Sequence, residues 1–257
     1  MLDLFGGTLV GLALMALAAA VIGYSKTALG GLAVVAVALF ASILPARQST
    51  AAILAVLIVG DLVAVWHYRR DADWALVRRL LPAVLPGLAL GSLFLAHVGD
   101  QTLRRSIGGV LLVLLGLQLW SRRRRADSDE GATGAARAAG HPAAAWGAGS
   151  AAGFATMTAN AAGPVMTLYL SAAGIDKRRF IGTNAWFFLV VNLVKVPFSI
   201  GLGLLHGADV ARAGLLAPLV VLGGVVGSAT VARISQRAFD VAVLLTSAVA
   251  AVALLVG

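Results

Sequence analysis

The sequence contains no cysteine and a single glutamate among its 257 residues, and charged residues make up only 12% of the chain. The lack of cysteine excludes disulfides, thiol catalysis, iron–sulfur clusters and thiolate zinc sites. The scarcity of charge excludes a soluble enzyme, a secreted domain and a nucleic-acid-binding module, because soluble domains carry about 25% charged residues. Instead, 60% of the residues are hydrophobic and the mean hydropathy is +0.94. This composition predicts an all-α integral membrane protein.

Long apolar runs divide the chain into two halves. A spanning helix needs about 20 apolar residues, and the runs correspond to 8–10 membrane segments. Between the halves lies a polar stretch of small and charged residues, which predicts an exposed linker. We therefore expect a first transmembrane repeat over 1–120, a linker over 121–142 and a second repeat over 143–257. The apolar runs are 4–23, 28–45, 50–66, 76–96 and 104–120, then 143–157, 160–173, 180–205, 209–231 and 238–256.

The two halves resemble each other in sequence. Residues 72–91 align without gaps on 208–227, and the identities include an Asp, a Pro and two Gly at fixed spacing, which favours a duplication. The identical pairs are Ala72/Ala208, Asp73/Asp209, Ala75/Ala211, Leu80/Leu216, Pro82/Pro218, Val84/Val220, Gly87/Gly223 and Gly91/Gly227. A slightly shorter offset pairs Gly23 with Gly153, Arg47 with Arg178 and Asp61 with Asn192.

Basic residues predict the orientation of the chain. When the breaks between runs are assigned alternately to two sides, 14 Lys and Arg fall on one side and 4 on the other. The positive-inside rule then places both termini outside and linker 121–142 in the cytoplasm of a multi-pass protein of the (inner) cell membrane. Each half crosses an odd number of times, so the second half is inverted relative to the first. Inverted repeats are typical of secondary transporters, whose substrate site lies where the repeats meet.

The first two segments of each half have interruptions at matching places. Gly23–Thr27 interrupts the first half and is followed by Gly30 and Gly31; Ala155–Asn160 interrupts the second half and is followed by Gly163 and Pro164. Such interruptions indicate broken helices or re-entrant hairpins whose free backbone lines a site. A plain tight hairpin is the alternative. Each repeat would then hold one such hairpin and three transmembrane helices.

Several short motifs resemble a known family of membrane carriers. The chain is similar to the sulfite exporter TauE/SafE family, whose members are also called sulfonate-uptake-permease-like transporters, and the likeness covers essentially the whole chain. In the second half the motifs are Gly153-Phe154, Asn160–Pro164, Leu168–Leu170, Gly174–Arg178, Asn184–Phe188 and Asn192–Pro197. In the first half they are Gly30-Gly31, Pro45, and Leu103–Arg105 with Gly108.

The resemblance implies a secondary transporter that moves sulfite, a sulfonate or a related organosulfur anion by alternating access, without a cofactor. An anion channel and a membrane-embedded enzyme are the alternatives. The enzyme would need paired carboxylates, a His pair or a nucleophile–base pair inside the spans, and the sequence has none of these. The family commonly has a denser glycine cluster in the first hairpin than Lys26–Gly31, which indicates a different site chemistry in this member.

Charged residues inside the apolar runs are the first candidates for a site, because a charge is costly in hydrocarbon. They are Lys26, Asp61 and Lys195. Lys195 shares one helix face with Asn184 and Asn192, and this stripe of amides and an ammonium suits an oxyanion. Either lysine could instead reach an interface and anchor a helix end, and the two amides could simply join helices.

Three further residues complete the predicted site. Thr156 and Asn160 would add donors at the second interruption, although threonine often bonds its own helix backbone. Asp61 is the ion-coupling candidate: it could carry a proton, or it could form an ion pair with Lys26 or Lys195.

The remaining polar residues predict structure rather than chemistry. Asp73 and Asp209 precede helices and are expected to be N-caps, and Arg212 is expected in a loop. The four histidines fall at breaks, so no metal site is expected. The small-residue pairs Gly87/Gly91 and Gly223/Gly227 could pack helices within one chain or between two chains of a homodimer. The expected partners are a small sulfur oxyanion and the lipid bilayer, with no nucleic acid.

Overall fold

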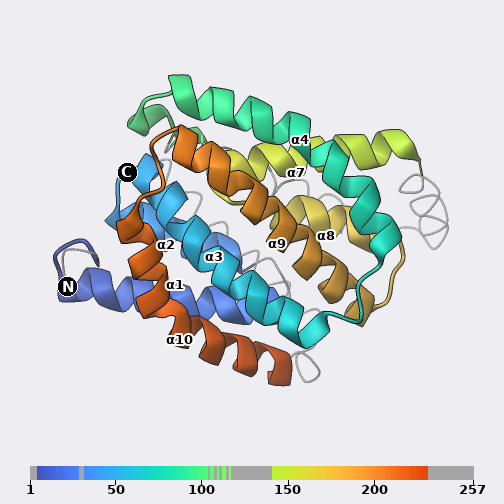
Figure 1. Cartoon of the computed structure of the whole chain (residues 1–257), viewed down its shortest axis with the longest axis horizontal. Helices are drawn as coiled ribbons and strands as arrows, with labels where there is room; N and C mark the ends of the chain where they lie inside the picture. Colours follow the sequence, from blue (N-terminus) through green and yellow to red (C-terminus); the bar gives the residue numbers. More distant parts are fainter. Residues whose placement is uncertain are drawn as a thin grey trace.

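The computed structural model describes residues 5–28, 32–103, 105, 106, 109, 112, 113, 116 and 141–230 (Figure 1). These residues form helices joined by short connections, and no strand occurs among them. The helices are α1 (Leu9–Thr27), α2 (Ala33–Ile43), α3 (Ala46–Tyr68), α4 (Trp74–His97), α7 (Pro142–Ala159), α8 (Gly163–Ala172), α9 (Lys177–Gly201) and α10 (Gly207–Thr230).

Within these ranges, five helices are long and apolar enough to cross a membrane: α1, α3, α4, α9 and α10. α2 and α8 contain only 11 and 10 residues, so each is roughly 15 Å long, about half the thickness of the hydrocarbon core. The protein is therefore an all-helical, multi-pass membrane protein in the part that the structure describes. The predicted segment 238–256, residues 121–140 of the linker, Gly30, Gly31 and much of 104–120 lie outside the described residues.

Local sequence signals account for the helix starts. The Thr8 hydroxyl caps α1 by accepting a hydrogen bond from the Gly11 backbone N–H at 2.9 Å. The Asp73 carboxylate caps α4, as the sequence predicts, and the Asp176 carboxylate caps α9. A side-chain oxygen at this position satisfies N–H groups that have no partner within the helix.

The helix interruptions lie later in the chain than the sequence predicts. α1 continues through Gly23–Thr27, and α7 continues to Ala159, so the second break comes at Asn160–Ala162. Glycine and hydroxyl residues favour a break locally, but here they serve contacts between helices. Gly23 permits close packing, and the Thr27 hydroxyl donates to the Gly224 carbonyl of α10 at 2.8 Å.

Each of two helix pairs contains one helix from the first half of the chain and one from the second half. α1 packs along α10, and α4 packs along α7 (Figure 1). In the α1/α10 pair, a Cβ atom on Gly23 or Gly223 would collide with the backbone of the opposite helix. In the α4/α7 pair, a Cβ atom on Gly87 or Gly153 would do the same. The small-residue positions therefore bring helices together within the chain.

The α3 and α9 helices form the centre of the bundle. They lie against each other and run in opposite directions (Figure 1). α3 also contacts α1 and α10, while α9 also contacts α4. The central pair is therefore surrounded by the two mixed pairs, and Asp61 of α3 and Asn192 and Lys195 of α9 are buried in the interior.

Candidate functional site

The side chains of two lysines are buried inside the bundle: Lys26 in the last turn of α1, and Lys195 within α9. The Lys26 side chain is 7% exposed, and Lys195 is 1% exposed. A buried ammonium is costly unless it is paired or fully hydrogen-bonded. The partners of the two lysines therefore determine what each can do.

Lys26 is neutralised by a carboxylate. Its Nζ atom lies 2.6 Å from Oδ1 of Asp61 on α3, and 4.2 Å from the centre of the Phe188 ring on α9. The second carboxylate oxygen, Oδ2, accepts a hydrogen bond of 2.6 Å from the Asn192 amide. This cluster joins α1, α3 and α9 through one ion pair, one charged hydrogen bond and one cation–π contact.

Lys195 has neutral oxygen partners. Its ammonium donates to the Thr156 carbonyl at 2.7 Å, to the Asn160 side-chain oxygen at 2.5 Å and, more weakly, to the Thr156 hydroxyl at 3.3 Å. Both acceptor residues belong to the C-terminal end of α7. A cation there is favoured by the helix dipole. The Thr156 carbonyl also accepts from the Asn160 backbone N–H at 3.0 Å, so the ammonium is its second donor.

The backbone at the end of α7 positions these acceptors. Asn160 adopts a left-handed conformation with φ of +49°, which asparagine tolerates better than most residues. Its side-chain amide donates to the Thr50 carbonyl of α3 at 3.1 Å, while its side-chain oxygen faces Lys195. The break between α7 and α8 thus supplies both the acceptors and their orientation.

The electrostatic balance of this interior region is positive. Lys26 and Asp61 cancel, whereas no carboxylate lies within 4 Å of Lys195 in the part of the chain that the structure describes. With both lysines protonated and Asp61 ionised, the buried cluster carries a net charge of +1. An excess positive charge in a water-poor interior attracts a small anion.

The structure divides the stripe that the sequence predicts on α9. Lys195, Asn192 and Asn184 are all buried, but only Lys195 contacts Thr156 and Asn160, and Asn192 instead contacts Asp61. Asn184 lies two helical turns before Asn192, roughly 12 Å along the axis. The side-chain oxygens of Asn184 and Asn192 are both buried without a hydrogen-bond partner.

Two predictions near the start of α10 are wrong. Arg212 is not in a loop: it lies in α10, is 2% exposed, and its guanidinium contacts the Asp209 carboxylate at 2.5 Å. Asp209 is not the N-cap but lies in the first turn, where the same carboxylate accepts from the His206 N–H at 3.0 Å. The spacing of three residues between Asp209 and Arg212 could have indicated the pair.

Sequence reasoning also misses the Thr50 carbonyl and the Tyr68 hydroxyl. The latter donates at 2.9 Å to the carbonyl of Thr27 at the end of α1. A backbone carbonyl leaves no signature in the sequence. The only signal at Tyr68 is that a tyrosine ends a span.

Comparison with known proteins identifies the family. The sulfite exporter TauE/SafE family matches residues 15–254, which is most of the chain. No curated protein and no solved structure matches the chain significantly. The matched region includes every buried polar residue described above. The chain belongs to the sulfite exporter TauE/SafE family, whose members are membrane transporters and not enzymes.

Proposed function

We propose that this protein is a secondary transporter of a small sulfur-containing anion, such as sulfite or a sulfonate, and that the anion binds at Lys195. The family match supports the substrate class. The observation that carries the site is the buried Lys195 ammonium, which has only neutral oxygen partners within hydrogen-bond distance among the described residues.

Exchange of these neutral partners for an oxyanion is favourable in free energy. A hydrogen bond between an ammonium and an oxyanion, in which both partners are charged, is stronger than one from the same ammonium to a neutral carbonyl or amide oxygen. In a partly dry cavity such a contact is worth about 2–3 kcal/mol net. Thr156 and Asn160, which now hold the ammonium, would line the site beside it. Lys26 would contribute its charge from the neighbouring cluster.

Alternating access requires two arrangements of similar energy, which inverted repeats supply. Several contacts support such repeats. Gly23 and Gly153 occupy matching positions, and each approaches the backbone of a helix from the other half. Asp61 and Asn192 also match, and they bond to each other at the centre. With both termini outside and linker 121–142 in the cytoplasm, the two halves would exchange roles during transport.

Asp61 is the proposed coupling residue. It is the partner that neutralises Lys26, so protonation of its carboxyl group would free the Lys26 ammonium for the anion. Asp61→Asn should then abolish proton-driven uptake but leave substrate exchange within about twofold of the parent. Loss of both activities from a variant that still inserts would assign Asp61 a structural role alone.

The test of the site is anion affinity in a variant without the ammonium. Lys195→Ala should weaken binding of methanesulfonate or sulfite by roughly 30- to 150-fold, because each 1.4 kcal/mol is tenfold in affinity. Lys195→Arg should also bind less well, since a planar guanidinium is larger than an ammonium. Binding is measured by the increase in melting temperature of purified protein with ligand concentration.

Arg78→Ala is the matched control, because Arg78 is an exposed cation on α4 outside the cluster. It should bind like the parent. If a folded, membrane-inserted Lys195→Ala variant keeps the parent's affinity, the proposed site is wrong. Counterflow of labelled substrate in proteoliposomes separates a carrier from a channel, which would show none.

Labelling tests the proposed orientation. Single cysteines at Ser128 and Gly257 should react with an impermeant reagent from opposite sides of the membrane, and no native cysteine interferes. Reaction from one and the same side would contradict the inverted arrangement of the halves.

A further inference from the structure

Two hollows lie at opposite ends of the central α3/α9 pair. The first, of about 510 Å³, is formed by the connection between α3 and α4 and by the N-terminal end of α9. The second, of about 480 Å³, is formed by the N-terminal end of α3 and by the connection between α9 and α10. α3 has 23 residues, so the hollows are separated by roughly 35 Å, slightly more than the hydrocarbon core of a bilayer, which is about 30 Å thick.

The two hollows correspond through the sequence repeat. Arg178 lines the first hollow and Arg47 lines the second. These arginines pair in the alignment of the halves, and each is the second residue of its helix. Asp73, in the first hollow, pairs with Asp209, which bonds to His206 in the second. One architecture is thus present twice, once at each end.

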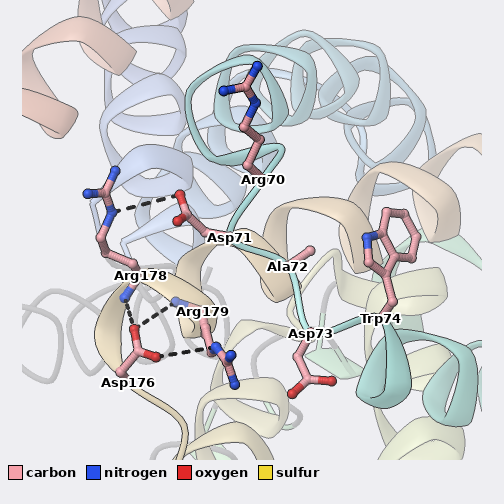
Figure 2. Close-up of a pocket in the computed structure, with 8 residues that line it drawn as sticks. All are labelled: Arg70, Asp71, Ala72, Asp73, Trp74, Asp176, Arg178 and Arg179. Carbon is pink, nitrogen blue, oxygen red and sulfur yellow. Dashed lines mark hydrogen bonds and ion pairs between the residues drawn. The ribbon is translucent and has the colours of Figure 1, made fainter.

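The arginines of the first hollow are held loosely. Figure 2 shows Arg178 turned toward Asp71, and Arg179 toward Asp176. The nitrogen–oxygen distances are 3.7 and 3.6 Å, and the arginine side chains are 75% and 63% exposed. Contacts this long are not hydrogen bonds, and exposed pairs of this kind contribute little to stability.

Two of the three carboxylates of this hollow have other partners. Asp176 accepts hydrogen bonds from the N–H groups of α9, and Asp73 accepts those of α4. The third, Asp71, faces Arg178 and is 27% exposed to solvent. An arriving oxyanion can therefore take the guanidinium groups while Asp176 and Asp73 keep these hydrogen bonds and Asp71 is hydrated by solvent. Planar guanidinium groups match the oxygens of a sulfonate in two-point contacts.

Buried polar groups of α9 lie between the hollows. Arg178 is exposed at the N-terminal end of the helix, and the buried Asn184, Asn192 and Lys195 follow along it. The side-chain oxygens of the two asparagines have no hydrogen-bond partner. The Lys195 cluster reaches α3 at the Thr50 carbonyl, through Asn160. Thr50 is one helical turn from Arg47 in the second hollow. Buried polar groups are thus spaced along the helix pair between the two hollows.

We propose that the two hollows are the mouths of the transport route, and that Arg178 and Arg47 receive the sulfur oxyanion at the two membrane faces. The proposal rests on the proposed function and adds to it the two places at which the anion enters and leaves the protein. Lys195 lies nearer the Arg47 mouth, so an anion entering at Arg178 has the longer path past Asn184 and Asn192.

The first test separates the mouths from the interior site. Arg178→Gln should raise the KM for methanesulfonate about 5- to 20-fold for transport that starts at one membrane face. Arg47→Gln should raise it by a similar factor for transport that starts at the other face. Equilibrium affinity in detergent, governed by Lys195, should stay within about twofold. The exposed Arg78→Gln is the matched control and should change neither quantity. An unchanged KM from both faces in both arginine variants would overturn the proposal.

The second test uses the absence of cysteine in the chain. Ala72→Cys in the first hollow and Gln48→Cys in the second should each react with the anionic thiol reagent methanethiosulfonate ethylsulfonate from one face only, the faces being opposite. Modification should reduce transport at least fivefold, and methanesulfonate should slow the reaction. Sulfite is avoided because it cleaves the disulfide formed. Modification without loss of transport at both positions contradicts the proposal.

Two further results would separate the mouths from a lipid site and from the interior site. If Arg178→Gln removes only a dependence of transport on anionic lipid, measured in vesicles with and without phosphatidylglycerol, the hollow holds a lipid headgroup and the proposal is wrong. If Lys195→Ala binds like the parent while both arginine variants show the expected KM changes, the proposed mouths are supported and the proposed interior site at Lys195 is wrong.

Discussion

The two buried lysines differ in a way that their sequence context does not show. Lys26 is paired with the Asp61 carboxylate, whereas Lys195 is held by the carbonyl of Thr156 and the side chain of Asn160. Both satisfy the rule that a buried charge needs partners, but only the first cancels its charge. Burial alone therefore does not mark an anion site; the chemistry of the partners does.

The largest expected effect comes from breaking the Lys26–Asp61 pair. Asp61→Leu leaves the Lys26 ammonium buried without a counter-charge, which should reduce the free energy of unfolding by about 3–5 kcal/mol. The double variant Lys26→Met/Asp61→Leu removes both charges and should recover most of that loss. Thermal unfolding in detergent measures the difference. A double variant no more stable than Asp61→Leu would show that the two charges do not depend on each other.

A smaller effect is expected at Lys195. Lys195→Met removes an ammonium that no carboxylate balances, so the loss is limited to the hydrogen bonds of that ammonium. The Asn160 side-chain oxygen loses this donor, while the Thr156 carbonyl keeps its bond from the Asn160 backbone N–H. The free energy of unfolding should fall by about 2–3 kcal/mol. The same unfolding assay applies. A loss equal to that of Asp61→Leu would contradict the difference between the two lysines.

The smallest effects are expected at the two amides of α9. Asn192→Leu removes a hydrogen bond to a carboxylate and should cost about 1.5 kcal/mol. The Asn184 side-chain oxygen has no hydrogen bond to lose, so Asn184→Leu should lower the free energy of unfolding less than Asn192→Leu does, while it slows transport. Equal destabilisation by both substitutions would place Asn184 in the structural network instead of on the route.

Hydropathy is sufficient to find the charged residues of the interior but not their partners. A lysine or an aspartate within an apolar run is visible in the sequence, and spacings of three and four place residues on one helix face. Whether Asp61 pairs with Lys26 or Lys195 depends on how α1, α3 and α9 pack, which no local pattern encodes. The ends of α3, α4, α9 and α10 lie within a few residues of the predicted ones because long apolar runs dominate there.

The errors have the same origin. The local flexibility of Gly23 predicts a break, but its role depends on α10, which lies far away in the chain. The cost of a charge in a membrane helix predicts a loop at Arg212, and its partner Asp209 removes that cost. In both cases a tertiary contact outweighs the local signal.

The pairing of α1 with α10 also determines when the protein can finish folding during its synthesis. α10 begins at Gly207, 180 residues after α1 ends at Thr27 (207 − 27). At a ribosome's rate of about 5–20 residues per second, α1 waits roughly 10–40 s in the bilayer with its glycine surface uncovered. α4 waits for α7 across only 45 residues, from His97 to Pro142 (142 − 97). A chain truncated before Gly207 would therefore present α1 to lipid or to quality-control proteases, however complete its first half is.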